Sequence, residues 1–311
     1  NKYKIIFAGT SEFGLPCLKS LIENDLFEVV AVITQPDKKQ GRKQELTPSP
    51  VKQKAQEKGL EVWQPAKIED IADSIQELSP DVMVVVSYGQ IIPEDILNIP
   101  EYGSINVHGS LLPRYRGAAV IPAPIRHGDK KSGVTIIKMD SGLDTGNILE
   151  QKKIELESKE TSSSLHDKLA ELSGEVIIPT LTSYIKGEIT PQPQDDSRAD
   201  YVKTLTKKDG HLDWTRPNRE IEREVRALNP WPGTFGYING KILKILETDN
   251  QIKPDSEQNP GILFVDKENN LNLQCGQGVL KIERLQPEGK KPLTAPEFLQ
   301  GYQKHLPAPL E

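Results

Sequence analysis

The first 34 residues constrain the fold most, because they place two short apolar strands on either side of one helical segment. Residues 3–9 are rich in strand-forming side chains, and residues 28–34 repeat that composition. Between them, apolar side chains recur with the spacing of one helix face at Leu15, Leu18, Leu21 and Ile22. A strand, a crossover helix and a second strand make a parallel sheet with a right-handed connection. The pattern therefore predicts an α/β fold with a Rossmann-like, mostly parallel sheet.

The turn from the first strand into the helix contains glycine, which raises the question of a nucleotide site. Residues 9–14 have glycine only at their two ends, and Leu15 and Pro16 follow them. A P-loop needs Lys and then Ser or Thr at that point, and the spacing also departs from G-x-G-x-x-G. We therefore interpret residues 9–14 as a tight strand-to-helix turn and not as a phosphate-binding loop.

The stretch that carries chemical function runs over residues 104–117, with the sequence Ser-Ile-Asn-Val-His-Gly-Ser-Leu-Leu-Pro-Arg-Tyr-Arg-Gly. It begins as a short strand, in which Asn106 and His108 share one face because side chains alternate along a strand. Ligands bind outside the carboxyl ends of strands in open α/β sheets. A histidine can exchange a proton near neutral pH, and an amide can donate to a developing oxyanion. Both residue types therefore suit a catalytic role at this edge.

A second polar loop, residues 140–146, follows another predicted strand at residues 133–139. Glycines on both sides of Asp144 make the loop tight, so that Asp144 can approach His108 and fix its tautomer. Spacing alone leaves two simpler alternatives open: His108 as a hydrogen-bonded structural residue and Asp144 as a turn former. No Ser or Cys is fixed into this set by spacing, which favours direct acyl transfer over a covalent intermediate.

Positive charge gathers in one long loop of an otherwise acidic chain. From residue 37 to residue 54 there are six basic side chains against two acidic ones, whereas the whole chain carries a net charge of −6. A run of charge is usually a solvated surface, but loops this long in compact domains are often functional. The first four basic residues are Lys38, Lys39, Arg42 and Lys43. Any contact with a nucleic acid would use a local patch of this kind.

The second half of the chain changes its hydrophobic period. Residues 190–208, which begin rich in proline and polar side chains, are interpreted as a linker. Beyond them, Asn239-Gly240 joins two strand patterns, a strong hairpin signal, and further short strands follow. The sequence therefore predicts two domains, at residues 1–189 and 209–311, of which the second is a smaller OB-like β-barrel.

Composition narrows the cellular setting. No apolar run reaches the length of a membrane-spanning helix, and the first residues are typical of a strand and not of a signal peptide. The two cysteines, Cys17 and Cys275, have neither metal-ligand spacing nor a disulfide framework. These features predict a cytoplasmic protein without a metal site, in which both thiols are small buried side chains.

The residues around His108 and Asp144 resemble the signature of the 10-formyltetrahydrofolate-dependent formyltransferases. The likeness rests on residues 106–119 and on Gly-Leu-Asp-Thr-Gly at residues 142–146, and it extends over nearly the whole chain. The resemblance implies transfer of a formyl group to an amine, with 10-formyltetrahydrofolate as co-substrate. It also implies that Asn106 donates to the oxyanion of a tetrahedral intermediate. His108 would then move the proton of the attacking amine or stabilise negative charge, and Asp144 would orient His108.

The same resemblance implies a folate pocket made by three segments. The apolar segment that follows the predicted strand at residues 81–87 would line the pterin, although the sequence alone allows it to be hydrophobic filler under a loop. Segments after His108 and before Asp144 would complete the pocket. The residues implied are Ser87, Tyr88, Gly89, Gln90, Ile91, Ile92, Ser110, Leu111, Leu112, Pro113, Asp140 and Gly142.

Three features resemble the branch of this family that formylates methionyl-tRNA: the basic loop with its Gly41-Arg42 pair, the second domain, and the sequences at residues 207–214 and 229–233. The resemblance implies a monomer whose partner is charged initiator methionyl-tRNA. The residues implied to bind it are Lys38, Lys39, Arg42, Lys43, Lys203, Lys207 and Lys208. Three alternatives stay open: a sugar-amine formyltransferase, a formyltetrahydrofolate hydrolase, and a non-catalytic RNA- or nucleotide-binding protein.

Overall fold

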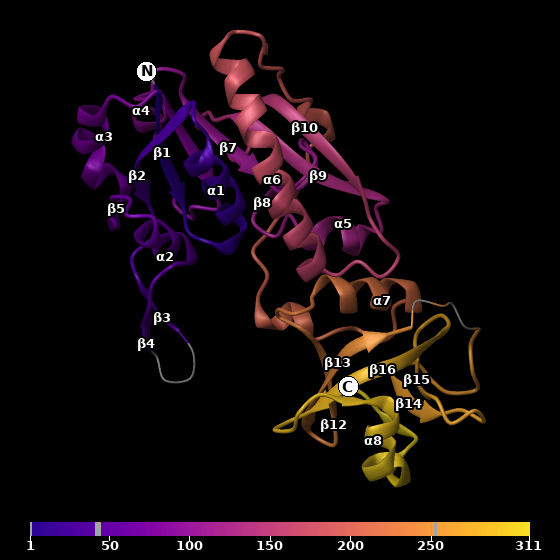
Figure 1. The fold of residues 1–311 in the computed structure, drawn as a ribbon. Coiled ribbons are helices and arrows are strands. Elements are labelled where there is room, and N and C mark those ends of the chain that lie inside the picture. The colour runs from indigo at the N-terminus through magenta and orange to yellow at the C-terminus, as the bar shows by residue number, and fades with distance from the viewer. Residues whose placement is uncertain (1, 41–44, 250, 252–253) are drawn as a thin grey trace. The chain divides into compact units, whose positions relative to one another are not determined.

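The structure, a computed structural model, describes residues 2–40, 45–249, 251 and 254–311 (Figure 1). The chain forms two compact units. The first unit consists of Asn1–Val120, Ser132–Ile154 and His166–Val202. The second unit consists of Ile121–Lys131, Glu155–Leu165 and Lys203–Glu311. Residues 190–202 of the segment interpreted as a linker therefore lie in the first unit.

The first unit is built on a seven-stranded sheet with the strand order β10-β9-β7-β6-β1-β2-β5 (Figure 1). Its strands are β1 (Tyr3–Gly9), β2 (Phe27–Ile33), β5 (Val62–Trp63), β6 (Val82–Val86), β7 (Ser104–His108), β9 (Lys131–Lys138) and β10 (Asn147–Glu155). Neighbours from β7 to β5 are parallel, and β9 pairs with β7 in the antiparallel direction. The predicted Rossmann-like, mostly parallel sheet is confirmed.

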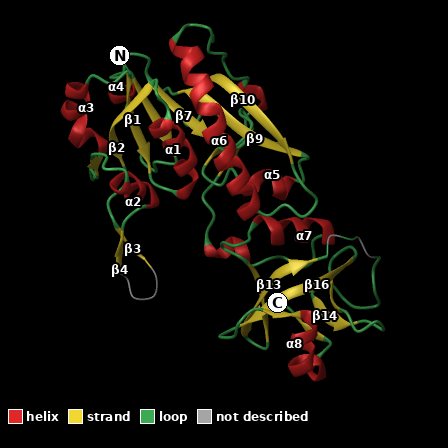
Figure 2. Cartoon of the chain, in the orientation of Figure 1, coloured by secondary structure: helices red, strands yellow, loops and turns green. Residues whose placement is uncertain are grey.

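Helices cover this sheet and bury its apolar side chains (Figure 2). They are α1 (Leu15–Glu23), α2 (Pro50–Glu57), α3 (Ala72–Leu78), α4 (Glu94–Leu97) and α6 (Ser162–Ile185), with short 3-10 turns η1 (Glu12–Gly14), η2 (Ile68–Ile71) and η3 (Asp196–Arg198). Ile6 of β1 packs with Ile75 of α3 and Ile96 of α4 in one buried cluster. Helix α6 packs closely against α1 at Gly174. A Cβ added at this glycine would lie 3.0 Å from the backbone of Pro16 in α1, so the absence of a side chain permits the close approach.

The second unit carries an antiparallel sheet in the order β12-β13-β16-β15-β14-β18, with β17 paired to β16. Its strands are β12 (Thr234–Ile238), β13 (Lys241–Thr248), β14 (Ile262–Val265), β15 (Leu271–Gln274), β16 (Val279–Pro287), β17 (Leu293–Thr294) and β18 (Ala308–Pro309). Tyr237 of β12 exchanges two backbone hydrogen bonds, of 2.6 and 2.8 Å, with Glu311 beyond β18. This exchange links the first strand of the sheet to the last, so the sheet closes toward the predicted barrel.

The helices of the second unit are α5 (Pro122–His127), α7 (Asn218–Ala227) and α8 (Ala295–Tyr302), with the turns η4 (Lys207–Gly210) and η5 (Gln303–His305). One ion pair and one hydrogen bond join two early segments to α7 of this unit. Arg126 of α5 donates to the buried Glu224 of α7 at 2.9 and 3.1 Å. Arg226 of α7 donates to the carbonyl of Glu160 at 2.8 Å. Buried charges of this kind hold elements together only when they are paired.

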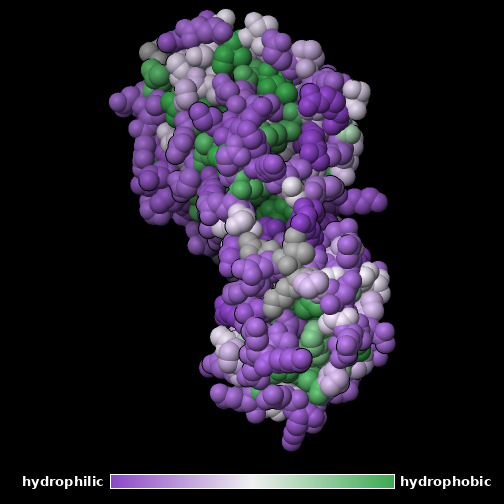
Figure 3. Space-filling model, turned by 90° about the vertical axis from the view of Figure 1, so that its right-hand side faces the viewer, coloured by the Kyte–Doolittle hydropathy of each residue, from purple (hydrophilic) through white to green (hydrophobic). Residues whose placement is uncertain are grey.

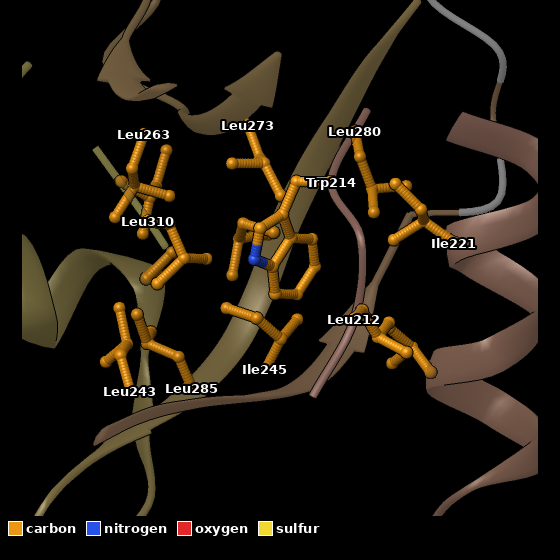
Figure 4. Packing of buried hydrophobic residues seen from close by; sticks show 14 of the residues in the cluster. Leu212, Trp214, Ile221, Leu243, Ile245, Leu263, Leu273, Leu280, Leu285 and Leu310 are labelled. Atoms are coloured by element: carbon orange, nitrogen blue, oxygen red, sulfur yellow. The ribbon is translucent and has the colours of Figure 1, made fainter. Parts of the chain in front are cut away.

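Trp214 lies among leucine and isoleucine side chains in the core of the barrel (Figure 4). The labelled neighbours are Leu212, Ile221, Leu243, Ile245, Leu263, Leu273, Leu280, Leu285 and Leu310. Strand β13 shows the alternation that builds this core, since Leu243 and Ile245 are buried while Lys244 between them is half-buried. Hydrophilic residues cover most of the face in Figure 3. No helix among the described residues is long and apolar enough to cross a membrane.

Candidate active site

Asn106 and His108 lie on β7, beside the parallel strand β6. Val85 of β6 pairs with Asn106. His108, the last residue of β7, is therefore level with Ser87, just after the end of β6. His108 is buried, with 6% of its surface exposed, whereas Asn106 is half-buried. Both therefore lie at the carboxyl edge of parallel strands, where α/β sheets bind ligands.

Both ring nitrogens of His108 face oxygen atoms. Nε2 lies 2.9 Å from the backbone carbonyl oxygen of Tyr115, and Nδ1 lies 3.6 Å from a carboxylate oxygen of Asp144. The first distance is a hydrogen bond, and the second is an ion-pair distance that is too long for one. A carbonyl only accepts, so Nε2 carries hydrogen there, and a further proton would sit on Nδ1 beside the carboxylate.

The Asp144 carboxylate is held from two sides. Oδ2 accepts from the backbone N–H of Gly117 at 2.8 Å, while Oδ1 faces His108. The backbone of Asp144 is left-handed, with φ of 56°, which is uncommon for a residue other than glycine. A residue in this conformation persists only where its surroundings hold it. These contacts reach outside its own turn and favour a functional role over simple turn formation.

The loop that carries Asp144 reaches His108 by a route that the sequence did not predict. Strand β9 is antiparallel to β7, and Met139 just beyond it donates to the carbonyl of Ser104, the first residue of β7, at 2.8 Å. The loop therefore leaves the sheet at the opposite end of β7 from His108 and turns back. The pair forms because the loop folds over, and not because two strands end side by side.

The predicted folate-binding segment at residues 87–92 continues from β6. Ser87 and Gly89 have φ of 49° and 86°, so the chain bends sharply as it leaves the sheet. Ile91 is 89% exposed, whereas Tyr88 is buried, which raises the pKa of its hydroxyl to about 12. No polar atom of the described residues partners that hydroxyl. Ile91 is therefore open to a ligand, whereas Tyr88 belongs to the buried cluster of the first unit.

Two of the predicted folate-binding side chains support loops within the protein. The Gln90 amide accepts from the N–H of Ile68 at 3.1 Å and donates to the carbonyl of Ala66 at 3.3 Å. Ser110 is buried, and its hydroxyl donates to the carbonyl of Arg114 at 2.8 Å. This supporting contribution was not predicted from the sequence.

The other predicted segments are shaped by neighbouring strands and by their own side chains. Leu112, which lies between Leu111 and Pro113, donates its N–H to Thr135 of β9 at 3.1 Å. Its carbonyl accepts from Gln151 of β10 at 2.6 Å. In the loop before Asp144, the Asp140 carboxylate accepts from the N–H of Gly142 at 3.1 Å. These contacts fix the backbone on both sides of the His108–Asp144 pair.

The segment interpreted as a linker contains a group of polar residues whose contacts the sequence did not predict. Strands β8 (Arg116–Gly117) and β11 (Tyr201–Val202) form a two-stranded parallel sheet. The Arg116 guanidinium is buried and donates to Gln194 at 2.9 Å and to Asp196 at 2.7 Å. The arginine belongs to a motif that stood out in the sequence, but nothing at residue 194 signalled its partner.

The predicted tRNA-binding residues fall in both units. Lys38 and Lys39 are exposed on β3 (Lys38–Gln40), which forms a two-stranded antiparallel sheet with β4 (Glu45–Thr47). Arg42 and Lys43 lie outside the described residues. Asp37, at the base of this hairpin, accepts from Lys52 at 2.8 Å and from Gln64 at 2.7 Å, which lowers the pKa of its carboxyl. The base of the hairpin is thereby fastened to its own unit.

Lys203, Lys207 and Lys208 are exposed in the second unit. The turn that carries the last two is fixed by Asp209, which accepts from the N–H and hydroxyl of Thr206 at 2.6 and 2.7 Å. These hydrogen bonds lower the pKa of the Asp209 carboxyl. Within the described ranges, no group of three or more His, Cys, Asp or Glu side chains is arranged to hold a metal ion.

A Rossmann-like sheet with a His–Asp pair at the carboxyl edge of its parallel strands can support acid–base chemistry on a ligand bound there. Comparison with known families agrees and is more specific. Residues 2–181 match the formyl transferase family, and residues 204–303 match the formyl transferase C-terminal domain. The chain belongs to the formyl transferase family.

Curated relatives cover almost the whole chain. It is 42% identical over 302 residues to the methionyl-tRNA formyltransferase of Caldanaerobacter subterraneus subsp. tengcongensis, covering 96% of this chain and 97% of the relative. It is 44% identical over 301 residues to the methionyl-tRNA formyltransferase of Myxococcus xanthus, covering 96% of this chain and 95% of the relative.

Solved structures share the fold at lower identity. An N-formyltransferase from Helicobacter canadensis, in complex with folinic acid and dTDP-3-aminofucose, aligns with a TM-score of 0.66 at 19% identity, covering 90% of this chain and 99% of that one. HypX from Aquifex aeolicus, in complex with tetrahydrofolic acid, aligns with a TM-score of 0.60 at 16% identity, covering 97% of this chain and 48% of that one. At these identities the likeness concerns the fold alone.

Proposed function

We propose that this chain transfers the formyl group of 10-formyltetrahydrofolate to the α-amino group of initiator methionyl-tRNA, giving N-formylmethionyl-tRNA for translation initiation. The observation that carries the proposal is the His108–Asp144 pair in a chain that is 42–44% identical to methionyl-tRNA formyltransferases over 96% of its length. We propose that the protein acts in the cytoplasm and as a monomer.

We assign the chemistry to three side chains. The Asn106 amide would donate to the oxyanion that forms when the amine attacks the formyl carbon. His108 would carry a proton from the attacking amine toward the leaving nitrogen, through Nδ1, because Nε2 is engaged by the carbonyl of Tyr115. The Asp144 carboxylate, 3.6 Å from Nδ1, would orient the ring and balance its charge.

The co-substrate would bind along the loops next to this pair. The exposed Ile91 side chain offers an apolar contact for a pterin ring. Leu143, which precedes Asp144, is 59% exposed and adds a second apolar side chain. The folate-binding residues proposed are Ser87, Tyr88, Gly89, Gln90, Ile91, Ile92, Ser110, Leu111, Leu112, Pro113, Asp140 and Gly142.

We further propose a division of work along the chain. Residues 1–189 would be the catalytic domain, residues 190–208 a linker, and residues 209–311 a tRNA-binding domain. The tRNA contacts proposed are Lys38, Lys39, Arg42, Lys43, Lys203, Lys207 and Lys208. Lysine and arginine side chains suit contacts with the phosphates of tRNA, since binding to a nucleic acid backbone is electrostatic.

The sugar-amine alternative draws on the fold of the solved structures, several of which are sugar N-formyltransferases. Their identity to this chain is 19–20%, less than half that of the methionyl-tRNA formyltransferases. The basic hairpin at residues 38–47 is also better explained by a polyanionic acceptor than by a small sugar.

One assay separates these functions. The protein is mixed with 10-formyltetrahydrofolate and, in parallel, with charged methionyl-tRNA, with a nucleotide-linked amino sugar, or with water as the acceptor. We expect N-formylmethionyl-tRNA in the first reaction only. Formylation of the sugar, or release of formate without an amine, would replace the proposal with the corresponding alternative. Absence of all three products would favour a binding protein.

The basic hairpin gives a second test. Replacing Lys38 and Lys39 by Ala, and separately Arg42 by Ala, should lower kcat/KM for charged tRNA and flatten its dependence on salt, because fewer counterions are released. KM for the folate donor should not change. Lys152→Ala with Lys153→Ala is the matched control for the Lys38 and Lys39 pair, and Lys153→Ala alone is the control for Arg42→Ala, since both lysines are exposed on β10 and each control changes the net charge equally. Equal losses in the control pair would remove the specific role of the hairpin.

A further inference from the structure

Arg116 is a buried cation, and it is the second-to-last residue of the stretch at residues 104–117 that contains His108. Its side chain is 2% exposed and donates to Gln194 at 2.9 Å, to Asp196 at 2.7 Å and to the Tyr201 hydroxyl at 3.0 Å. Burial by itself would lower the pKa of Arg116, but hydrogen bonds to Asp196 and Tyr201 raise it above its usual value. The guanidinium therefore stays charged and ties residues 194–201 to the loop at residues 114–117.

The Gln194 amide joins Arg116 to the loop of Asp144. Its Oε1 accepts from Nε and Nη2 of Arg116 at 3.2 and 2.9 Å. Its Nε2 donates to the carbonyl oxygens of Asp144 and Gly146, both at 2.8 Å. The chemistry fixes this orientation, because a flipped amide would set its NH2 against a guanidinium and its oxygen against two carbonyls. One side chain thus satisfies groups on both loops next to His108.

The same segment holds the other partner of His108. The N–H of Tyr115 donates to the Asp200 carboxylate, and the N–H of Arg116 donates to the Asp200 carbonyl at 2.9 Å. Tyr115 presents its carbonyl to His108 Nε2 from a left-handed backbone with φ of 60°. Asp144 is left-handed too, and Gln194 bonds to its carbonyl. Two residues in an uncommon conformation, one on each side of the imidazole, are therefore held by residues 194–202.

We propose that Gln194, backed by Arg116, is a positioning residue for formyl transfer, and this inference rests on the function proposed above. It acts through Asp144, by fixing the backbone from which the carboxylate faces His108. Residues 194–202 are therefore a brace of the catalytic pair as well as a connection to the next domain. The effect of a displaced brace should fall on the chemical step, because catalytic groups lose efficiency steeply when they shift.

The first test compares three variants. Gln194→Ala should lower kcat by about 10- to 100-fold while KM for the folate donor and for charged tRNA stays the same. Gln194→Glu keeps an acceptor for Arg116 but turns a carboxylate oxygen toward two carbonyls, so it should lose as much. Gln192→Ala is the matched control, because the Gln192 side chain is exposed and donates only to the nearby carbonyl of Thr190 among the hydrogen bonds described. Wild-type kcat in Gln194→Ala would overturn the proposal. If that variant fails to fold, Gln194→Glu decides in the same way.

The second test asks whether the effect passes through Asp144. In an Asp144→Ala background, Gln194→Ala should have no further effect on kcat, because the group that it positions is already gone. An equal fold loss in both backgrounds would show that Gln194 does not act through Asp144 and would overturn the proposal.

A spectroscopic measurement separates this inference from the function on which it rests. If the wild type does not formylate methionyl-tRNA, the proposed function fails, and the brace is then judged by ¹⁵N NMR of the His108 ring. Gln194→Ala should shift the His108 Nδ1 resonance, and Gln192→Ala should leave it in place. A His108 spectrum that is the same in Gln194→Ala and in the wild type would overturn the brace.

Discussion

The surroundings of His108 and the core of the barrel are held together by different kinds of contact. Around His108, positions are set by directed polar contacts, such as Asp144 to the N–H of Gly117 and Gln194 to Arg116. In the barrel, Trp214 is enclosed by aliphatic side chains from strands and helices (Figure 4). The contacts around His108 depend on the angles and distances between particular atoms. The packing of the barrel core depends on how well the side chains fill the available volume.

This difference predicts which property each region controls. A hydrogen bond contributes only about 0.5–1.5 kcal/mol to net stability, but it fixes geometry because it depends on direction. A buried aliphatic side chain contributes about 1.5–3 kcal/mol and tolerates small shifts. We therefore expect changes near His108 to reduce rate with little loss of stability, and changes in the barrel core to do the reverse.

Removal of the imidazole should have the largest effect on rate. His108→Ala and Asn106→Ala should each lower kcat by about 100- to 10,000-fold, the range for loss of an acid–base group or an oxyanion donor. The melting temperature should change little, because the Tyr115 carbonyl keeps a contact of 3.3 Å with the Ser110 hydroxyl. His305→Ala, at an exposed position, is the control. Near-normal turnover in either site variant would remove the mechanism.

Asp144→Asn should give the next largest loss of rate, about 100- to 1,000-fold, since the side chain keeps its shape but loses the charge beside His108. Its oxygen can still accept from Gly117, so the protein should remain folded. The measurement is kcat as a function of pH, together with a thermal melt. A pH–rate profile like that of the wild type would mean that Asp144 only forms a turn.

The converse variant lies in the barrel. Leu273 is fully buried on β15, and Leu273→Ala should lower the free energy of unfolding by about 2–5 kcal/mol, through lost burial and a cavity. The kcat of the folded protein should stay the same, because no site residue is moved. Leu26→Ala, at a side chain that is 48% exposed, should change stability by less than about 0.5 kcal/mol. A large fall in kcat for Leu273→Ala would break the comparison.

The smallest expected signal comes from the thiols, one in each unit. Burial raises the pKa of Cys17, and burial with the nearby Asp255 raises that of Cys275 to about 12, so both stay protonated at neutral pH. The folded protein should therefore react very slowly with a thiol reagent. Leu273→Ala should speed labelling of Cys275 but not of Cys17. Equal acceleration at both sites would mean that the two units unfold together.

The sequence by itself determined the elements whose signals are local. The periodicity of the first 34 residues predicted β1, α1 and β2, and the parallel pairing of the two strands follows from their connection. Asn239-Gly240 predicted the β12–β13 turn, where both residues have positive φ. Thr294-Ala-Pro-Glu297 has the sequence pattern of a capping box, and both of its reciprocal contacts are present at the start of α8. Each of these signals depends on residues close together in the chain, which is why it can be read without the fold.

The sequence also gave the residue types of the candidate site, through the motif around His108 and the glycine-flanked Asp144. It did not predict how Asp144 reaches His108. Strand β9 is antiparallel to β7, so the Asp144 loop begins at the far end of the strand and turns back. An alternating pattern shows which residues share a face of a strand but not the direction of the neighbouring strand. The path of the Asp144 loop therefore became visible only in the tertiary structure.

Only the tertiary structure revealed the brace at residues 194–202. The contact between Arg116 and Gln194 joins residues that are 78 positions apart, and that of Asp144 with Gln194 spans 50 positions. A glutamine in a polar, proline-rich segment has the same sequence signature whether it is solvated or bonded to a buried guanidinium. Its role is decided by burial and by the direction of its hydrogen bonds, and both exist only when the chain has folded.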